Sequence, residues 1–304
     1  MSDELYAAID LGANSFHLVI MRRHDSNLVT VDGYREIVRL ASGINPEHHQ
    51  LRPEARRRAL RCLNDIRQRL AQHSVQKVRV VGTSAFRTLR QNADFIKDAE
   101  QALGLPIEIV TGEEEARLIY LGATWGLPQS NRLVVDIGGG STEIIIGHGG
   151  TTELAVSLDV GSASLSAAYF QANRITQAHL NKAREHVRRL LTKAIPAEQV
   201  PSSDLVAVGS SGTAKSLSWV MRSLHLSNGD ITRSGLERVS PLLWQVQNID
   251  QLSQVLNLNV RRTHVFPGGY AIMSEVFAYL NVEHMTISGR ALREGMIVEM
   301  LQSA

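Results

Sequence analysis

The chain has 304 residues, a formal net charge of +2, and 43% hydrophobic and 20% charged residues. This length suits two domains better than one core. No window reaches the ~20 apolar residues of a membrane span, and Met-Ser-Asp-Glu at the start lacks the basic residues of a secretory signal, so we expect a cytoplasmic protein without a membrane partner. The net charge is too small to indicate a nucleic-acid partner, and we expect none. The single cysteine, Cys62, excludes an internal disulfide.

The first third of the chain predicts three strands and a basic helix. Apolar or alternating residues over 5–11, 16–22 and 27–38 indicate a small antiparallel sheet, with a bulge or turn at Asp32-Gly33. Pro53 begins a helix to about Gln72, whose apolar side includes Cys62 as a packing residue. Arginines crowd its other faces, either as a lane for a polyanion or, as is more common for such faces, as a solvated surface.

A predicted strand over 75–82 leads into the turn Gly82-Thr83-Ser84-Ala85-Phe86-Arg87. Hydroxyls and amides at a helix start, followed by Arg87, suit a phosphate oxygen. A plain helix N-cap also explains Thr83 and Ser84. A helix over about 92–104 and a strand over 106–110 follow.

The next helix begins with three acids, Glu113, Glu114 and Glu115. Thr111 and Glu114 form a capping box, and acids in the first turn interact favourably with the helix dipole, which accounts for the first two. Glu115 lies a further hundred degrees around the helix, towards its packing side. A carboxylate there can align a water molecule and accept its proton, although a purely structural role is about equally consistent with the sequence.

Two β-branched runs flank a glycine turn at residues 132–146, Arg-Leu-Val-Val-Asp-Ile-Gly-Gly-Gly-Ser-Thr-Glu-Ile-Ile-Ile. This pattern predicts a β-hairpin whose glycines bring backbone N–H groups close to an anion. Asp136 and Glu143 bracket the turn, and carboxylates repel a phosphate unless a divalent cation lies between them. The sequence therefore predicts Mg²⁺ here, although an ordinary glycine turn capped by Asp136 remains the simpler alternative for this segment alone.

A Gly/Pro-punctuated segment, 125–130, marks the expected boundary between domains 1–125 and 126–304. The second domain continues with a strand over 151–159, helices over about 162–171 and 176–194, and a strand over 204–209. Another glycine-rich turn, Gly209-Ser-Ser-Gly-Thr213, comes next. Residues 233–257 predict two short helices, because Gly235 and Pro241 interrupt the pattern. A buried helix to Leu280, a strand over 284–288 and a last helix complete the chain.

The two halves of the chain repeat one another. Residues 8–20 align without a gap on residues 134–146, so that Asp10 corresponds to Asp136 and His17 to Glu143. Residues 80–85 align likewise on 207–212. Two matched pairs in the same order indicate a duplicated domain. We expect two such domains to form a cleft with the ligand between them.

Seven motifs, in order, resemble the exopolyphosphatase and guanosine pentaphosphate phosphohydrolase family, within the actin, heat-shock protein and sugar kinase superfamily. They begin at Asp10, Arg35, Gly82, Gly112, Asp136, Gly209 and Ala291, in the segments 10–17, 35–40, 82–87, 112–117, 136–143, 209–213 and 291–295. The resemblance implies an α/β fold of two duplicated actin-like (ribonuclease H-like) domains, each with a mixed sheet flanked by helices. The chain is similar to the short, two-domain form, since longer relatives continue into further helical domains.

The resemblance implies an Mg²⁺-dependent hydrolase that releases the terminal phosphate of polyphosphate, with a monovalent cation such as K⁺ as an optional addition. Its catalytic glutamate corresponds to Glu115, and its metal-associated acids to Asp136 and Glu143, which the duplication extends to Asp10. The expected phosphate-binding residues lie in the four turns: Gly12, Asn14, Ser15, Thr83, Ser84, Arg87, Gly138, Gly139, Gly140, Ser141, Thr142, Gly209, Ser211, Gly212 and Thr213. Ala13 stands where the family usually has serine, which removes one hydroxyl contact.

Three alternatives stay open at this point. Hydrolysis of guanosine pentaphosphate is the close rival to hydrolysis of polyphosphate, because no turn distinguishes a nucleoside pocket from a phosphate lane. An ATP-dependent phosphotransferase using Gly209–Thr213 would share the fold, and a nucleotide sensor would share the binding turns without catalysis. We expect short chains or a nucleotide to suit this form better than long polymer, and a homodimer is compatible with the sequence.

Overall fold

The computed structural model describes residues 4–24, 27–45, 50–200, 205–246 and 248–303. The chain divides into two compact units, residues 1–127 with 292–304 (unit 1) and residues 128–291 (unit 2). Each unit is an α/β structure built on one mixed sheet. Across the described ranges, no helix is both long enough and apolar enough to cross a membrane.

Unit 1 contains a five-stranded sheet in the order β3-β2-β1-β4-β5. The first three strands are antiparallel, whereas β4 runs parallel to β1 and to β5. A bulge at Val31 shifts the register of β3, one residue before the predicted Asp32-Gly33 irregularity. The strands are β1 (Leu5–Leu11), β2 (Ser15–His24), β3 (Asn27–Ile37), β4 (Val75–Gly82) and β5 (Glu108–Ile109).

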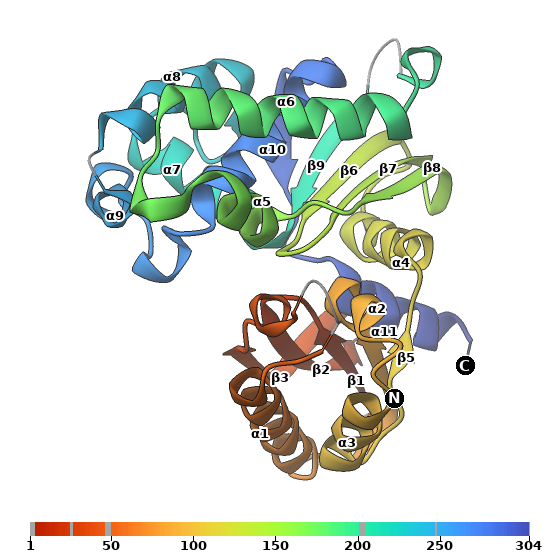
Figure 1. Ribbon diagram of the computed structural model, residues 1–304. Helices are drawn as coiled ribbons and strands as arrows, with labels where there is room; N and C mark the ends of the chain where they lie inside the picture. The colour runs from red at the N-terminus through yellow and green to blue at the C-terminus, as the bar shows by residue number, and fades with distance from the viewer. Residues whose placement is uncertain (1–3, 25–26, 46–49, 201–204, 247, 304) are drawn as a thin grey trace. The chain divides into compact units, whose positions relative to one another are not determined.

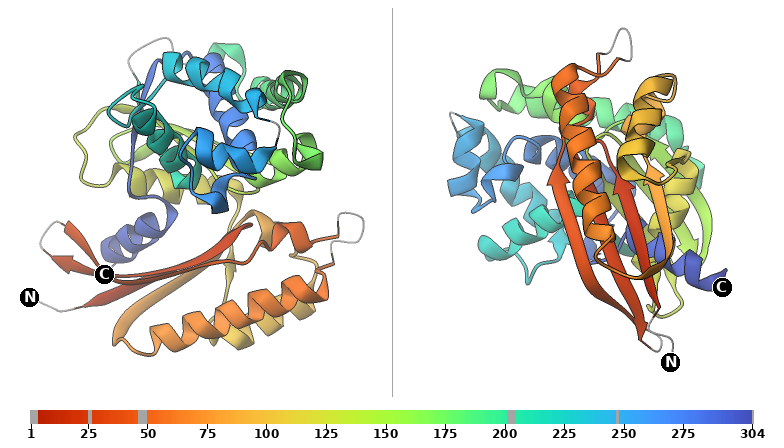
Figure 2. Two further views of the ribbon diagram at one scale, coloured as in Figure 1. Left: turned by 90° about the vertical axis from the view of Figure 1, so that its left-hand side faces the viewer. Right: turned by 90° about the horizontal axis from the view of Figure 1, so that it is seen from below.

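Helices cover both faces of this sheet (Figure 1, Figure 2). On one face, apolar residues of α1 (Pro53–Leu70) and α3 (Ala93–Leu103) form a core with alternate residues of β1, including Ile9 and Leu11. Because successive strand residues point to opposite faces, Asp10 lies on the other face. That face is packed by α11 (Leu292–Gln302), which also contacts α4 (Gly112–Thr124), while α2 (Ser84–Thr88) follows β4.

The last helix, α11, therefore belongs to the first unit and not to the predicted second domain, which was to extend from 126 to 304. The cause lies at Gly295, where a Cβ atom would come within 1.8 Å of the carbonyl oxygen of Leu118 and 3.1 Å of the amide nitrogen of Gly122 on α4. Without a side chain at this position, the two helices approach backbone to backbone. A helical pattern gives the apolar face of α11 but not the element that covers it.

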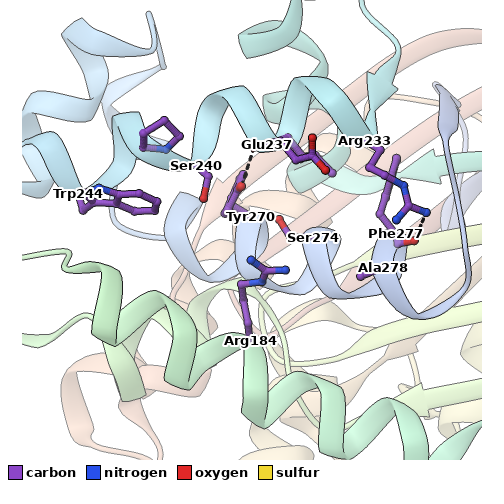
Figure 3. A pocket seen from close by; sticks show the side chains of 11 residues that line it. Arg184, Arg233, Glu237, Ser240, Trp244, Tyr270, Ser274, Phe277 and Ala278 are labelled. Carbon is purple, nitrogen blue, oxygen red and sulfur yellow. Dashed lines mark hydrogen bonds between the residues drawn. The ribbon is translucent and has the colours of Figure 1, made fainter.

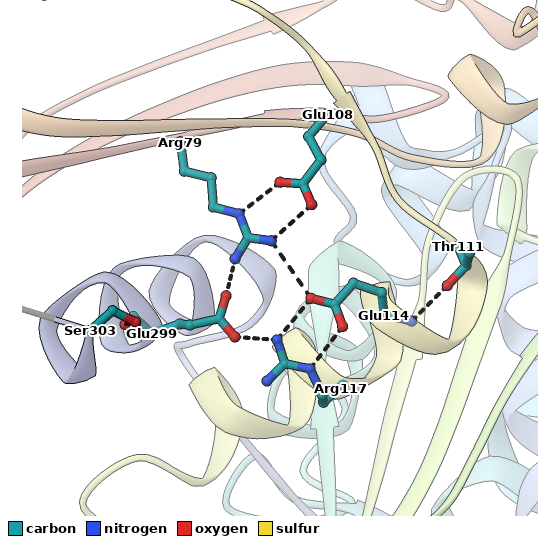
Figure 4. A network of polar contacts seen from close by, with 7 residues as sticks. All are labelled: Arg79, Glu108, Thr111, Glu114, Arg117, Glu299 and Ser303. Carbon is teal, nitrogen blue, oxygen red and sulfur yellow. Dashed lines mark hydrogen bonds and ion pairs between the residues drawn. The ribbon is translucent and has the colours of Figure 1, made fainter.

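A polar network also attaches α11 to its neighbours (Figure 4). Arg79 on β4 and Arg117 on α4 both bind the carboxylate of Glu299. Arg79 also contacts Glu108 at 2.9 Å, and Arg117 donates to both oxygens of Glu114 at 2.8 and 2.7 Å. The hydrogen bonds from Arg117 hold the pKa of Glu114 below its usual value, so this carboxylate stays charged at neutral pH.

Unit 2 contains a six-stranded sheet in the order β10-β11-β9-β6-β7-β8. Its strands β6, β7 and β8 form an antiparallel meander, and β9 runs parallel to β6. The strands are β6 (Asn131–Ile137), β7 (Thr142–His148), β8 (Thr151–Leu158), β9 (Val206–Ser210), β10 (Ile231–Thr232) and β11 (His284–Ile287).

The core of unit 2 lies between this sheet and four helices, with α6 crossing over the strands in Figure 1. The helices are α5 (Ser162–Tyr169), α6 (Gln177–Ala194), α7 (Ser211–Ser223) and α10 (Phe266–Tyr279). Two further helices, α8 (Arg233–Gln245) and α9 (Leu252–Val255), also contribute buried residues to this core. Two helices do occupy residues 233–257, but Pro241 lies inside α8 and does not end it. Proline there frees the carbonyl of Glu237, an exposed residue that water can reach.

The two sheets confirm the duplication. Read from β8, the order β8-β7-β6-β9-β11 of unit 2 repeats the order β3-β2-β1-β4-β5 of unit 1. The hairpin turns match as well, because the amide of Gly12 donates to Ser15 O at 3.2 Å and that of Gly138 to Ser141 O at 2.9 Å. In the register of the strands, Asp10 pairs with His17 as Asp136 pairs with Glu143.

Candidate functional site

The acidic start of α4 places Glu115 inside unit 1. Thr111 caps the helix by accepting a hydrogen bond from the amide of Glu114 at 3.1 Å, which is one half of the predicted capping box. The Glu114 carboxylate binds Arg117 and Arg79 instead of supplying the other half. Glu113 is exposed and Glu114 belongs to the network of Figure 4, whereas Glu115 is only 6% exposed. Burying a carboxylate without compensation is costly, so Glu115 requires a charged or hydrogen-bonding partner.

Arg87 provides that partner. Its Nη1 donates to Glu115 Oε2 at 2.6 Å and to the carbonyl oxygen of Val110 at 3.4 Å. Among the described residues, Nε and Nη2 of Arg87 donate to no acceptor, and the side chain is 23% exposed. The guanidinium therefore holds Glu115 with one nitrogen and retains donors that can bind an oxyanion.

Arg87 reaches this position because β4 ends in the turn at Gly82. A Cβ atom on Gly82 would lie 2.7 Å from the ring of Phe86, so the turn closes only around glycine. The short helix α2 then begins at Ser84, after Thr83, which is buried and whose side chain makes no cap hydrogen bond. The predicted residues of this turn thus lie together, with Arg87 as the one that contacts Glu115.

The first hairpin turn leaves two amides available. Among the described residues, the N–H groups of Ala13 and Asn14 donate to no backbone or side-chain acceptor, while their carbonyls accept from Ala41 and Arg39. Ser15 Oγ lies 2.9 Å from His17 Nε2, and the other ring nitrogen of His17 contacts Arg293 on α11. The predicted hydroxyl of Ser15 is therefore already engaged by the histidine.

The glycine turn of unit 2 repeats this arrangement. The N–H groups of Gly139 and Gly140 donate to no described acceptor, whereas the carbonyls of Gly138 and Gly139 accept the first amides of α5. Gly161 packs directly against the backbone of this turn, because a Cβ atom there would lie only 2.4 Å from Gly139 C and Gly140 N. Two unused donors at a rigid turn form a concavity that favours an anion.

Asp136 and Glu143 lie directly opposite each other on β6 and β7, so their side chains share one face of the sheet. They are 8% and 1% exposed. Ser210 Oγ donates to Asp136 Oδ2 at 2.5 Å, and Ser157 Oγ donates to Glu143 Oε1 at 2.8 Å. Two buried, adjacent carboxylates repel each other unless a proton or a cation lies between them, and a pair of oxygen donors is the set that Mg²⁺ prefers.

This pair is nevertheless smaller than a complete metal site. Within the described parts of the chain, no group of three or more histidine, cysteine, aspartate or glutamate side chains is assembled to hold an ion. Mg²⁺ keeps several waters and often takes its remaining ligands from substrate phosphates, so two carboxylates are compatible with it. The chemistry of Asp136 and Glu143 therefore fits the ion.

Several predicted hydroxyls point into the protein. The hydroxyl of Thr142 is fully buried and donates to Val160 O at 2.6 Å, while Ser211 and Thr213 both donate to Ile137 O, at 2.9 and 3.0 Å. These three side chains hold the turns together and keep no proton to donate to a phosphate. Ser211 has φ +76°, a strained conformation for a residue with a Cβ atom.

Sequence reasoning assigned no site role to four residues that contact the predicted motifs, namely Ser157, Ser210, Arg262 and Arg293. Ser157 could not be assigned from the sequence, because only the register between β7 and β8 places it beside Glu143. Arg262 lies against the start of α7, where a Cβ on Gly212 would be 2.0 Å from its Nη2. Arg293 reaches His17 from the other end of the chain. The basic pair at 261 and 262, just before a Pro-Gly-Gly segment, was the one available signal.

The basic faces and the cysteine behave as ordinary structure. Arg57 and Arg69 on α1 pair with Glu54 and Asp32, and Arg58 donates to a backbone carbonyl. Cys62 is buried in the core of unit 1, and burial raises the pKa of its thiol to about 12. A protonated, buried thiol is unreactive, which agrees with the predicted packing role.

The fold and the paired hairpins define an actin-like α/β protein with a duplicated domain. A sequence profile described as the Ppx/GppA phosphatase family matches residues 19–304. The chain belongs to this family. Two relatives from strains of Vibrio cholerae serotype O1, named guanosine-5'-triphosphate,3'-diphosphate pyrophosphatase, are 37% identical over 305 aligned residues. The alignment covers 99% of this chain but 60% of each relative, so the chain spans about 60% of the length of these relatives.

Solved structures confirm the fold. An Aquifex aeolicus Ppx/GppA enzyme is 24% identical with a TM-score of 0.80, over 97% of this chain and 99% of that one. An exopolyphosphatase from Cytophaga hutchinsonii is 22% identical with a TM-score of 0.87, over 99% of both chains. At this level of identity the likeness concerns the fold alone.

Proposed function

We propose that the chain is an exopolyphosphatase that hydrolyses the terminal phosphoanhydride of inorganic polyphosphate and releases orthophosphate. The observation that carries the proposal is the pair of buried Glu115 and half-buried Arg87, in which one guanidinium nitrogen holds the carboxylate while others remain available for an oxyanion. A protein that only bound phosphates would need the arginine but not a buried base beside it. Family membership supports the same class of reaction.

Glu115 accepts the proton of the attacking water in this mechanism. Oε2 is held by Arg87 Nη1, which fixes the side chain so that the carboxylate can align a water molecule in line with the scissile bond. The free nitrogens of Arg87 can donate to phosphate oxygens, where negative charge accumulates as the leaving group departs. Within unit 2, the free amides of Gly139 and Gly140 offer donors of the same kind.

Asp136 and Glu143 would hold Mg²⁺. When bound, the ion neutralises phosphate charge and so favours attack at the terminal phosphorus. Ser210 and Ser157 orient the two carboxylates through their hydroxyl groups, which limits rotation of the acids. Four further points stay predictions. They are a role of Asp10 in metal binding, a monovalent cation such as K⁺, a homodimer and a cytoplasmic location.

Guanosine pentaphosphate is the second candidate substrate, because the Vibrio cholerae relatives at 37% identity carry the name of an enzyme for that nucleotide. Both substrates end in the same phosphoanhydride, so the same residues would act on either. What differs is the group beyond the terminal phosphates. A direct comparison of the two substrates therefore decides between them.

The test measures orthophosphate release, with Mg²⁺, from short polyphosphate, long polyphosphate and guanosine pentaphosphate in parallel. Glu115→Gln preserves shape and removes the base, and we expect it to lower kcat by about 10²-fold or more. Glu113→Gln, an exposed acid in the same helical turn, is the matched control and should leave kcat unchanged. Release of phosphate from none of the substrates, or an active Glu115→Gln variant, contradicts the proposal.

The same assay separates the remaining alternatives. ADP formation from ATP that requires an acceptor would identify a phosphotransferase. Tight binding of guanosine pentaphosphate without turnover would identify a sensor. Removal of Mg²⁺ by a chelator should abolish release, and Asp136→Asn should raise the Mg²⁺ concentration needed for half-maximal activity.

A further inference from the structure

A pocket in unit 2 lies apart from all the predicted phosphate-binding turns. It is an open pocket lined by residues of α6, α8 and α10, with a volume of about 340 Å³, a size at the lower end of small-molecule sites (Figure 3). Its lining residues are Arg184, Arg233, Leu236, Glu237, Ser240, Pro241, Trp244, Tyr270, Ser274, Phe277 and Ala278. None of them belongs to the sequence motifs at 10–17, 82–87, 136–143 or 209–213.

The pocket contains polar groups that can contact a ligand. Ser274 is 8% exposed, and its hydroxyl lies beside that of Tyr270 on the pocket wall. A hydroxyl group can rotate, so Ser274 can donate to a ligand that accepts a hydrogen bond. Tyr270 donates to Leu236 O at 2.7 Å and so fixes the wall beside it.

Arg184 points into the pocket with its terminal nitrogens available (Figure 3). Its Nε donates to Glu275 Oε1 at 2.7 Å, and Arg188 donates to Oε2 of the same buried carboxylate at 2.8 Å. Among the described residues, neither Nη of Arg184 has an acceptor. The buried Glu275 thus orients the guanidinium, and the outer nitrogens form a fork for a ligand with two adjacent acceptors.

Glu237 supplies hydrogen-bond acceptors, in contrast to the donors of Arg184. It is exposed on α8 and pairs with no described cation. Trp244, one turn of helix beyond Ser240, presents an aromatic ring on the same lining. The pocket therefore offers a fork of donors, an acceptor carboxylate and a ring for stacking.

The charges around the pocket disfavour a polyphosphate. Arg184 and Arg188 share Glu275, Arg233 pairs with Glu283 at 2.6 Å, and Glu237 adds a further negative charge. Three arginines and three glutamates leave the surroundings close to neutral. A highly charged anion would find little net attraction in these surroundings. A neutral ring with hydrogen-bonding edges suits them better, because it needs no net charge of the opposite sign.

We propose that this pocket binds a purine base, with guanine preferred. Guanine carries two adjacent acceptors, O6 and N7, that match the fork of Arg184. Its N1–H and amino group are neighbouring donors that match the two oxygens of Glu237, and adenine lacks that donor pair. Trp244 stacks on the ring, and stacking of a base on an aromatic side chain is a general source of affinity. The site is a second binding site, distinct from the residues of the proposed hydrolysis.

Isothermal titration calorimetry with guanosine tests the proposal, because guanosine has no phosphate that the glycine turns could bind. We expect saturable binding with one site per chain, and binding of adenosine weaker by about ten-fold or more. Orthophosphate at millimolar concentration should not compete. Absence of saturable heat with guanosine, or equal affinity for adenosine, overturns the assignment.

Variants locate the binding. Glu237→Gln changes an exposed, unpaired side chain and should weaken guanosine binding by about ten-fold or more while the protein stays folded. Ser274→Ala removes a hydroxyl of the pocket lining and should weaken guanosine binding while the protein stays folded. Arg189→Gln removes an exposed arginine of the same helix α6 outside the pocket and should bind normally. Guanosine binding that Glu237→Gln and Ser274→Ala leave intact places the ligand elsewhere and refutes the proposal.

Discussion

The contact between Gly295 and α4 gives the sharpest test of how unit 1 is held together. Alanine is normally the better helix former, and Gly→Ala inside a helix is favourable by about 1 kcal/mol. At Gly295, however, the new Cβ would lie 1.8 Å from Leu118 O, and 2.8 Å from Leu118 C. Both atoms are backbone, so no side chain can rotate away.

The expected cost follows from this geometry. A comfortable contact requires more than 3 Å, so α11 must move by roughly 1 Å or more from α4. Overpacking of this kind costs about 1–3 kcal/mol, and a backbone obstacle places it at the upper end. After the gain in helix propensity, Gly295→Ala should destabilise unit 1 by about 2 kcal/mol. For a unit of this size, that corresponds to a melting temperature lower by about 4–8 °C.

Differential scanning calorimetry of wild type and Gly295→Ala provides the measurement. The two units can unfold separately, so the shift should affect one transition if two are resolved. Gly150→Ala is the control, because a Cβ atom there would have nothing within 4 Å. A Gly295→Ala protein that melts at or above the wild-type temperature refutes the close approach of α11 and α4.

Three further predictions concern unit 1. Thr111→Ala removes the cap that accepts from the amide of Glu114 and should cost about 1 kcal/mol in chemical denaturation. Hydrogen bonds from Arg69, and then from His73, hold the pKa of Asp32 well below its usual range. The interaction of Asp32 with Arg69 therefore stabilises the fold fully above about pH 4, the pKa of an unfolded aspartate. This stabilisation is lost as the pH falls further. Asp32→Asn should therefore be less stable than wild type at pH 7 by up to about 1 kcal/mol, and the difference should shrink below pH 4.

Each of these outcomes has an informative opposite. Thr111→Ser should retain most of the stability lost in Thr111→Ala, and equal losses in both variants would mean that the hydroxyl does not cap α4. A constant difference between wild type and Asp32→Asn across pH 2–7 would mean that the ion pair contributes nothing to the acid transition.

Cysteine reactivity gives an independent check on the core. With its pKa raised to about 12 by burial, Cys62 should react with a thiol reagent at neutral pH only when unit 1 opens. The rate should therefore rise sharply across the unfolding transition. Rapid labelling of the native protein would show that α1 does not bury this residue.

Much of the fold could be predicted because the local patterns were strong. The strand at 5–11 and the helix from Pro53 agree with the structure almost residue for residue, since apolar periodicity and a proline start signal are local properties. Gly235 and Pro241 were both expected to interrupt residues 233–257, but α8 contains both, and the carbonyl that Pro241 frees belongs to the exposed Glu237.

The candidate site was predictable in its motifs but not in its hydrogen bonds. The glycine-turn pattern placed Asp136 and Glu143 correctly on either side of one hairpin turn, because a hairpin fixes its own register. The inward direction of the Thr142 hydroxyl depends on Val160, and the pairing of Arg87 with Glu115 joins separate elements. Such contacts depend on tertiary packing, which no local pattern contains.

The return of α11 to unit 1 has a consequence for synthesis on the ribosome. Residues 128–291 form a continuous unit that can fold as soon as it emerges, whereas unit 1 waits for the segment that carries Gly295 and Glu299. At ordinary elongation rates this delay is on the order of ten seconds. Throughout it, the apolar surface of β1 and α4 is open to solvent and to other nascent chains. Unit 1 should therefore be the part of the molecule that depends on chaperones during translation.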